Sequence, residues 1–132
     1  MKYIILILVI FSAHAHSCLS PIGEFSNKEE LAHADSIFVA SLAAWEELEE
    51  TPIAPNIISE IMSDPLVRIT FTIDSKISGD PLNSYFASIC FGDFKKGEKY
   101  IFLAGKTRLH SYLENTQENI NMINTYLKAK TQ

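Results

Sequence analysis

The chain has 132 residues, a formal net charge of −5 at neutral pH, and hydrophobic residues at 47% of its positions. This length suffices for one domain with a buried core. The acidic balance argues against a nucleic-acid partner, because binding to a phosphate backbone depends on an excess of Lys and Arg.

The first residues have the features of a secretory signal peptide. Lys2 precedes an uncharged apolar run at 3–11, and small residues follow at Ala15 and Ser17. A basic start, a short apolar run and small residues at alternate positions are typical of such a leader. The run is also shorter than the roughly 20 residues that span a bilayer. We expect cleavage after Ser17, with cleavage after Ala15 as the alternative.

Removal of residues 1–17 would leave a single exported domain, residues 18–132, secreted or periplasmic and without a transmembrane segment. Two cysteines remain in it, Cys18 and Cys90. In an oxidising compartment an even pair of distant cysteines is interpreted first as a disulfide. Cleavage after Ser17 would also give Cys18 a free α-amino group beside its thiol.

Two short elements are predicted in the first part of the exported chain. Ser26 and Asn27 are suitable N-capping residues, and glutamates three positions later predict a short helix that runs through Ala34. The apolar run 37–42 is β-branched at its start and predicts a strand buried on both faces, although so short a run could also be helical.

The segment 45–64 differs in composition, because four glutamates crowd together and two prolines follow. The glutamates are Glu46, Glu47, Glu49 and Glu50. We interpret them as a solvated hairpin tip rather than a cation site, because their spacing does not resemble a calcium loop. Residues 57–62 could form one helical turn.

The clearest strand covers 67–73, where apolar and polar residues alternate. The residues predicted to face the core are Val67, Ile69, Phe71 and Ile73, and those predicted to face outward are Arg68, Thr70, Thr72 and Asp74. A turn at 78–81 and a mixed strand at 84–89 follow. The latter strand ends at Cys90.

The remaining elements are a strand at 100–104, after a loop bracketed by Gly92 and Gly97, and a C-terminal helix capped at Asn115. The apolar helix residues that share one face are Ile120, Ile123 and Leu127. Short strands, one long alternating strand and a flanking helix predict a small closed β-barrel, with the C-terminal helix packed across one mouth. An open α+β sandwich fits the pattern less well.

Four segments add a second line of argument: ADSIFVA at 34–40, FTIDSKISG at 71–79, SIC at 88–90 and GEKYIFLAGK at 97–106. In this order they resemble the netrin-like domain of tissue inhibitors of metalloproteinases. Cys18 stands where that family places its N-terminal cysteine. The resemblance covers Cys18 to Lys106 and implies a five-stranded OB-type barrel.

The resemblance also implies a bridge between Cys18 and Cys90 and an inhibitory ridge. In that family the α-amino group and carbonyl oxygen of the N-terminal cysteine chelate the catalytic zinc of the target protease. Leu19 would enter the specificity pocket of the protease. The strip formed by Ala87, Ser88 and Ile89 would make the second contact.

The chain departs from the family at Ser20, where the inhibitors usually carry a second cysteine, and it lacks the other paired cysteines. It is therefore a divergent member with a single bridge. A plain alternative is that this bridge only clamps the N-terminus onto the barrel. A third reading is acylation of Cys18, although Ala15 is not the residue that bacterial lipoprotein signals usually have there.

Catalysis has little support in the sequence. His33 and His110 are interpreted as surface or structural residues, and a Cys90 nucleophile assisted by His110 would be abolished by the bridge. No phosphate loop, two-histidine motif or catalytic triad order is present. The aromatic residues Trp45, Tyr85 and Phe86 are interpreted as core or rim, because they lack basic neighbours in the sequence.

We therefore expect an exported binding module that is not an enzyme and has no cofactor or metal of its own. The resemblance implies that it inhibits a zinc metalloproteinase. The alternative is a non-inhibitory structural or envelope-associated netrin-like domain, anchored by a lipid if Cys18 is acylated. The sequence does not indicate the target or the oligomeric state.

Overall fold

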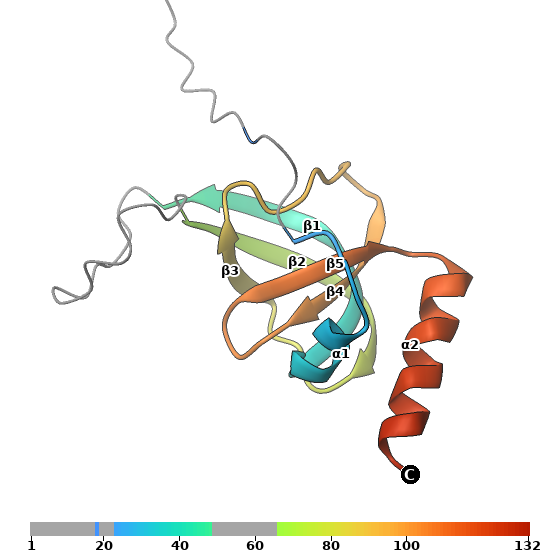
Figure 1. Cartoon of the computed structure of the whole chain (residues 1–132). Helices are drawn as coiled ribbons and strands as arrows, with labels where there is room; N and C mark the ends of the chain where they lie inside the picture. Colours follow the sequence, from blue (N-terminus) through green and yellow to red (C-terminus); the bar gives the residue numbers. More distant parts are fainter. Residues whose placement is uncertain (1–17, 19–22, 49–65) are drawn as a thin grey trace, which may run out of the picture.

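A computed structural model describes residue 18 and residues 23–48 and 66–132 (Figure 1). The predicted signal peptide, Leu19 and the predicted helical turn at 57–62 lie outside the described residues. The elements, in chain order, are α1 (Glu29–His33), β1 (Ser36–Glu47), β2 (Leu66–Ser78), β3 (Ser84–Ser88), β4 (Lys99–Ala104), β5 (Leu109–Glu114) and α2 (Gln117–Lys130).

The five strands form one antiparallel sheet in the order β3-β2-β1-β4-β5. The two ends of this sheet approach each other, because the Phe86 N–H of β3 donates to the Thr107 carbonyl just before β5, at 2.9 Å. The sheet therefore curls into a small barrel, and the predicted five-stranded OB-type fold with a flanking C-terminal helix is confirmed.

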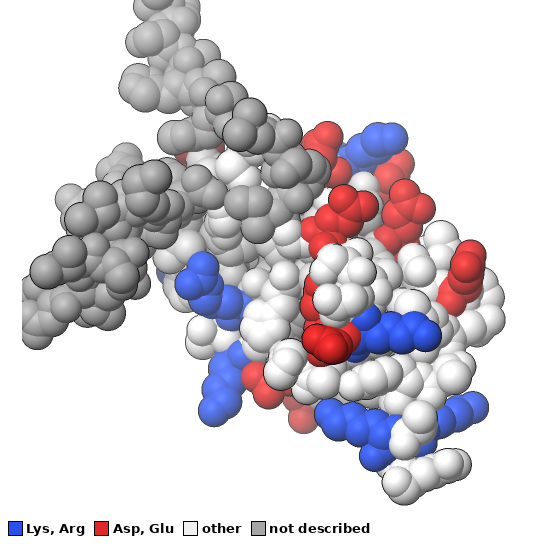
Figure 2. Space-filling model, viewed as in Figure 1, with Lys and Arg blue, Asp and Glu red and all other residues white. Residues whose placement is uncertain are grey.

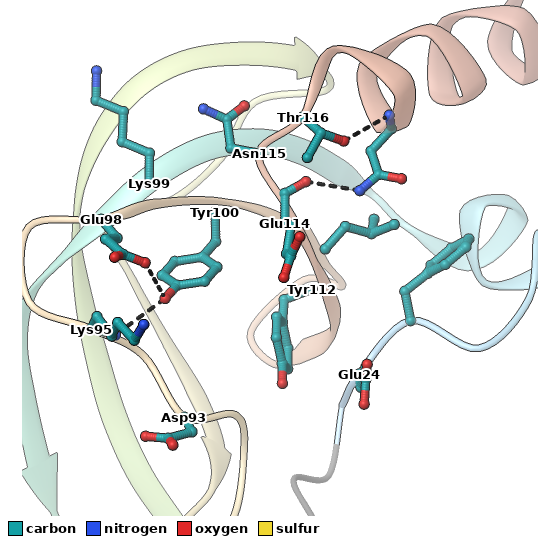
Figure 3. A pocket seen from close by; sticks show the side chains of 13 residues that line it. Glu24, Asp93, Lys95, Glu98, Lys99, Tyr100, Tyr112, Glu114, Asn115 and Thr116 are labelled. Carbon is teal, nitrogen blue, oxygen red and sulfur yellow. Dashed lines mark hydrogen bonds between the residues drawn. The ribbon is translucent and has the colours of Figure 1, made fainter.

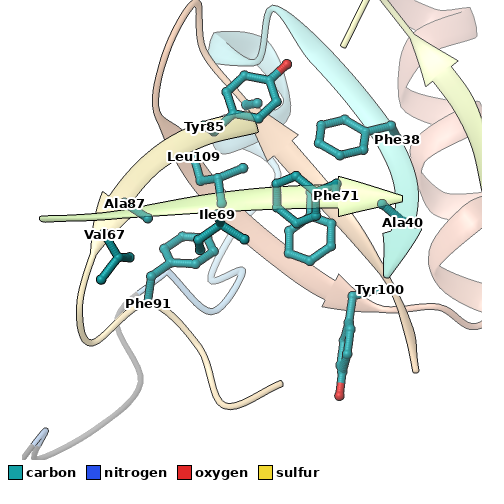
Figure 4. Packing of buried hydrophobic residues seen from close by; sticks show 12 residues of the cluster. Phe38, Ala40, Val67, Ile69, Phe71, Tyr85, Ala87, Phe91, Tyr100 and Leu109 are labelled. Carbon is teal, nitrogen blue, oxygen red and sulfur yellow. The ribbon is translucent and has the colours of Figure 1, made fainter. Parts of the chain in front are cut away.

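The barrel interior is filled by aromatic and aliphatic side chains (Figure 4). Phe71 and Phe102 have ring centroids 4.5 Å apart, and Phe38 meets Phe71 edge-on at 5.5 Å. The prediction for 67–73 is confirmed: Val67, Ile69 and Phe71 are buried in this core, and Ile73 packs against it. The intervening residues of β2 are exposed or half-buried.

Strand β1 is longer than the predicted run at 37–42. Its residues Ser36–Ala40 are buried on both faces, as predicted for the apolar run, and the strand then continues to Glu47. A bulge between Leu42 and Ala44 shifts the pairing so that Trp45 lies opposite the inward-facing Ile69. A bulge places two residues opposite one and changes which face the next residue occupies. Trp45 therefore packs against the barrel core.

The first two glutamates of the predicted hairpin tip are the last residues of β1 and are paired with β2, so the prediction of a tip is wrong for them. Glu46 and Glu47 are exposed, and Glu46 lies 3.5 Å from Arg68 on the paired strand. Glu49 and Glu50 lie outside the described residues. The described part of the acidic cluster therefore has the solvent exposure that the sequence predicts.

The outer face of β1 and β4 is also apolar, and it is covered by the helices. Ile37, Val39, Ile101 and Leu103 form a second cluster with residues of α1 and α2. Helix α2 contributes the buried Ile123, with Ile120 and Leu127 beside it, as its periodicity predicts. The helix thus packs against the outer face of the sheet rather than across a mouth of the barrel (Figure 1).

Both helices begin slightly differently from the prediction. Helix α2 is capped by Thr116, whose Oγ1 accepts the N–H of Asn119 at 3.2 Å, and the predicted cap at Asn115 is wrong by one residue. At α1 the N-cap position is Lys28, which makes no side-chain capping bond, so the predicted caps at Ser26 and Asn27 are wrong by one or two residues. The Asn27 side chain still contributes, because its Oδ1 atom accepts the N–H of Glu29 at 2.9 Å. The Ser26 N–H and hydroxyl group both contact Glu30. Burial alone would raise the pKa of Glu30, but hydrogen bonding by Ser26, with smaller contributions from Ser111 and Asn27, outweighs burial and lowers that pKa.

Strand β5 is absent from the sequence-based prediction. A register shift at β4 leaves His110 as an extra residue between Leu109 and Ser111. Leu109 therefore faces the barrel core, whereas Leu113 belongs to the outer cluster. Burial still alternates along β5, but one of its buried positions is the polar residue Ser111, so the sequence shows no run of alternating apolar residues.

Candidate functional site

The first candidate site is built around the disulfide that joins Cys18 to Cys90 across 72 residues, with Cα atoms 5.5 Å apart. Cys90 sits in the turn that follows β3. Ser88 forms this turn, because its carbonyl accepts the Phe91 N–H at 2.9 Å and its hydroxyl accepts the Cys90 N–H at 3.2 Å. Cys90 is nearly buried, whereas Cys18 is exposed on the surface. The predicted bridge is therefore present.

The predicted contact strip divides into an inaccessible and an accessible part. Ala87 is 2% exposed and packs in the barrel core, opposite Val67 of β2. Ser88 and Ile89 are half-buried. Successive strand residues point to opposite faces, so the side chain of Ala87 cannot take part in a contact with a partner. Leu19 lies outside the described residues.

A hollow of about 330 Å³ lies beside this strip, and we call it the apolar hollow after the four hydrophobic side chains among its lining residues. The residues that line it are Leu42, Trp45, Ile89, Gly92, Asp93 and Phe94. Leu42, Trp45, Ile89 and Phe94 are half-buried hydrophobic residues that pack against the barrel core. Sequence reasoning found only Ile89, because Leu42, Trp45 and Phe94 reach the hollow through the barrel closure and the bulge in β1.

Groups with catalytic potential are dispersed over the described chain. His33 and His110 are exposed on different elements, and the His110 ring packs over Gly105. The sulfur atoms of Cys90 and Cys18 are bonded to each other. In this form Cys90 cannot act as a nucleophile, and Cys18 has no thiol that could carry a lipid. Within residues 18, 23–48 and 66–132, no group of three or more His, Cys, Asp or Glu side chains is arranged to hold a metal ion.

The aromatic residues singled out in the sequence do not form one surface. Tyr85 is buried, and its hydroxyl accepts the Leu82 N–H at 2.7 Å and lies 3.1 Å from the Ser36 hydroxyl. Phe86 points outward, and the Arg68 guanidinium lies over its ring at 5.4 Å. The cross-strand pair Arg68–Phe86 thus supplies a basic neighbour that sequence position did not reveal.

Comparisons with protein-family models, curated proteins and solved structures find no match to this chain. Among the described residues, no helix is both long and apolar enough to cross a membrane.

Proposed function

We propose that the chain is an exported netrin-like binding module whose Cys18 end inhibits a zinc metalloproteinase. The observation that carries the proposal is the disulfide, which fastens Cys18 to the residue that follows Ile89. Ile89 in turn lines the apolar hollow with Trp45 and Leu42. An exposed N-terminal cysteine and an apolar contact surface are thus tied to one end of the barrel.

The chemistry of the proposal depends on the α-amino group of Cys18 after cleavage behind Ser17. An α-amino group has a pKa of about 7.7–8.0, so it can lose its proton to a metal near neutral pH. Catalytic zinc keeps one coordination position open for such a ligand. The Cys18 carbonyl oxygen would bind the same ion, and Leu19 would enter the adjacent pocket of the protease.

Intact mass and N-terminal sequencing of the exported protein provide the first test. A chain that begins at Cys18 with an unmodified amine supports the proposal. A chain that begins at His16, or one that carries a lipid on Cys18, contradicts it. The lipid would instead select the envelope-associated alternative.

The second test compares three forms of the protein against a panel of zinc metalloproteinases. The native form should inhibit, and the two modified forms should not. One Ala ahead of Cys18 keeps the amine away from the zinc, and acetylation removes the lone pair of the amine. Neither change touches the core, so circular dichroism and Tm should be unaltered. Equal inhibition by all three forms would exclude chelation, and no inhibition by the native form would leave the non-inhibitory structural domain.

A third test concerns the apolar hollow. Trp45→Ala should weaken inhibition by about 1–3 kcal/mol through lost apolar burial in the complex. Leu82→Ala is the matched control, because Leu82 is an exposed hydrophobic residue, 49% accessible, before the start of β3. Equal effects of the two substitutions would mean that the hollow is not the contact surface.

A further inference from the structure

A second and larger hollow of about 760 Å³ opens on the other side of the loop that carries Asp93 (Figure 3). It lies between the N-terminal segment around Glu24, the loop before β4, and the end of β5. The N-terminal segment is held in place by β5, because the Phe25 N–H donates to the Tyr112 carbonyl and the Tyr112 N–H donates to the Gly23 carbonyl. We refer to this hollow as the tyrosine groove.

The floor of the tyrosine groove is aromatic. Tyr100 and Tyr112 line it with their rings nearly perpendicular, at 85° and 6.3 Å between centroids. Phe94 packs edge-on against both rings from behind. Most of the other lining residues are polar or charged, so the groove combines an aromatic floor with polar walls.

The two tyrosine hydroxyls differ in their partners. The Tyr100 hydroxyl is occupied, because it accepts the Lys95 N–H at 3.2 Å and donates to Glu98 Oε2 at 3.1 Å. In the described part of the chain the Tyr112 hydroxyl has no hydrogen-bond partner, and it points to the side of the groove where Glu24 and Asp93 lie (Figure 3). Burial raises the pKa of Tyr112, and the negative charges of Glu24 and Asp93 raise it further.

The groove carries more negative than positive charge. Its lining carboxylates are Glu24, Asp93, Glu98 and Glu114. Of the two lysines that line it, Lys99 is bound to Asp74 at 2.7 Å. Figure 2 shows several acidic side chains, with a basic one among them, in the upper part of the described surface. Because the described residues form no metal-ligand cluster, the charge suits an organic cation better than a metal ion.

We propose that the tyrosine groove binds an alkyl ammonium or guanidinium group, with the cation between the Tyr112 hydroxyl and the carboxylates of Glu24 and Asp93. An ammonium group has three N–H donors and no acceptor, which matches one phenolic and two carboxylate oxygens. The alkyl stem packs on the tyrosine rings, whose faces also attract cations. The cation belongs to a Lys or Arg side chain of a polypeptide or to a free polyamine.

The test is an NMR and calorimetric titration of the exported protein with matched probes. The probes are Nα-acetyl-lysine amide, Nα-acetyl-arginine amide, 1,5-diaminopentane and the neutral isostere Nα-acetyl-norleucine amide. The cationic probes should shift the amide resonances of Glu24, Asp93 and Tyr112, and the norleucine derivative should bind at least about tenfold more weakly. Equal binding of the norleucine derivative, shifts confined to other regions, or no binding by any cation would overturn the proposal.

Substitutions then test the assigned groups. Glu24→Gln and Tyr112→Phe keep the shape of each side chain and should weaken binding by about tenfold and about fivefold. Asp80→Asn is the matched control, because Asp80 is an exposed carboxylate that pairs with Lys76 at 2.9 Å and does not line the groove. Equal effects of Glu24→Gln and Asp80→Asn would show only a general charge effect and would contradict the assigned site.

The probes also distinguish the source of the cation. Tighter binding of lysine or arginine amides than of the diamine identifies a polypeptide side chain, and the reverse order identifies a free polyamine. Both results support the groove as an organic-cation site. Cys18 does not line the tyrosine groove, and Asp93 is the one residue that lines both the groove and the apolar hollow. A failure of the protease-inhibition tests would therefore leave the cation-binding result unaffected.

Discussion

At the scale of single residues, the stability of the barrel depends on aromatic side chains that alternate with exposed polar ones. Phe71 is 5% exposed, and its ring contacts Phe38, Tyr85 and Phe102. Its neighbour Thr72 faces outward and is exposed. Adjacent positions on one strand therefore have very different energetic weight.

Phe71→Ala should lower the free energy of unfolding by about 3–5 kcal/mol, because it removes a large buried ring and leaves a cavity. Thr72→Ala is the matched control and should change it by less than about 0.5 kcal/mol. Urea unfolding followed by circular dichroism measures both. Similar losses at the two positions would contradict the assignment of inner and outer faces of β2.

Two glycines with positive φ differ in what surrounds them. Gly79 has φ of 68°, and a Cβ atom there would lie 2.1 Å from the Asp35 carbonyl oxygen. Gly97 has φ of 84°, but a Cβ atom there would meet nothing within 4 Å. The first position combines backbone strain with a clash against backbone atoms, and the second has backbone strain alone.

Gly97→Ala should therefore lower the free energy of unfolding by about 1–2 kcal/mol, the cost of a left-handed conformation. Gly79→Ala should lower it by about 1–3 kcal/mol more, because the turn after β2 must move away from the start of β1. Thermal or chemical denaturation of both variants checks the difference. If Gly97→Ala were the more harmful substitution, the close approach at Gly79 would be wrong.

At the scale of elements, helix α2 packs its apolar face against the outer face of the sheet. Hydrogen bonds at its N-terminal end also hold it to the end of β5. Its first turn is fixed by Thr116, which accepts the Asn119 N–H, and by the Asn119 amide, which donates to the Glu114 carbonyl at 2.9 Å. Its last turn carries Lys128 and Lys130, whose charges suit the negative end of the helix dipole.

Thr116→Ala should lower the free energy of unfolding by about 1 kcal/mol, because it leaves a helix N–H without its acceptor. Asn115→Ala should change it by less than about 0.5 kcal/mol, since Asn115 is exposed and is not the cap. Amide hydrogen exchange in residues 117–121 gives a local readout. A larger effect at Asn115 would restore the cap that the sequence suggested.

At the scale of the whole molecule, the disulfide is a covalent cross-link between Cys18 and the barrel. It spans 72 residues and joins Cys18 to the turn after β3. The same turn borders the apolar hollow, and the loop that follows it also borders the tyrosine groove. The bridge thus positions one end of the barrel as well as stabilising it.

Replacement of both cysteines, Cys18→Ser with Cys90→Ser, should lower the free energy of unfolding by about 4 kcal/mol, the chain-entropy value for a loop of this length. Cys90→Ser alone should cost about 2–5 kcal/mol and expose one thiol at Cys18. Thiol labelling of unfolded, unreduced native protein should find no free thiol. Two equivalents of label would mean that the exported protein is not bridged.

Much of this fold was predictable because local patterns report burial directly. The alternation from Val67 to Ile73 identified the inner face of β2, and the apolar run in β1 identified a strand buried on both sides. An even pair of cysteines in a chain predicted to be exported indicated the bridge between Cys18 and Cys90. The first two patterns lie within single strands, and the bridge follows from the number of cysteines. None of them requires knowledge of which residues are neighbours in the folded protein.

Sequence alone therefore determined the class of fold, the alternating β2 and the cysteine pair. Only the tertiary structure decided that Trp45 faces the core, that Ala87 is withdrawn from the contact strip, and that Glu24, Asp93 and Tyr112 line one groove. The physical reason is that bulges and barrel closure are set by hydrogen bonds between strands. Such bonds join residues far apart in the chain, and no local periodicity records them.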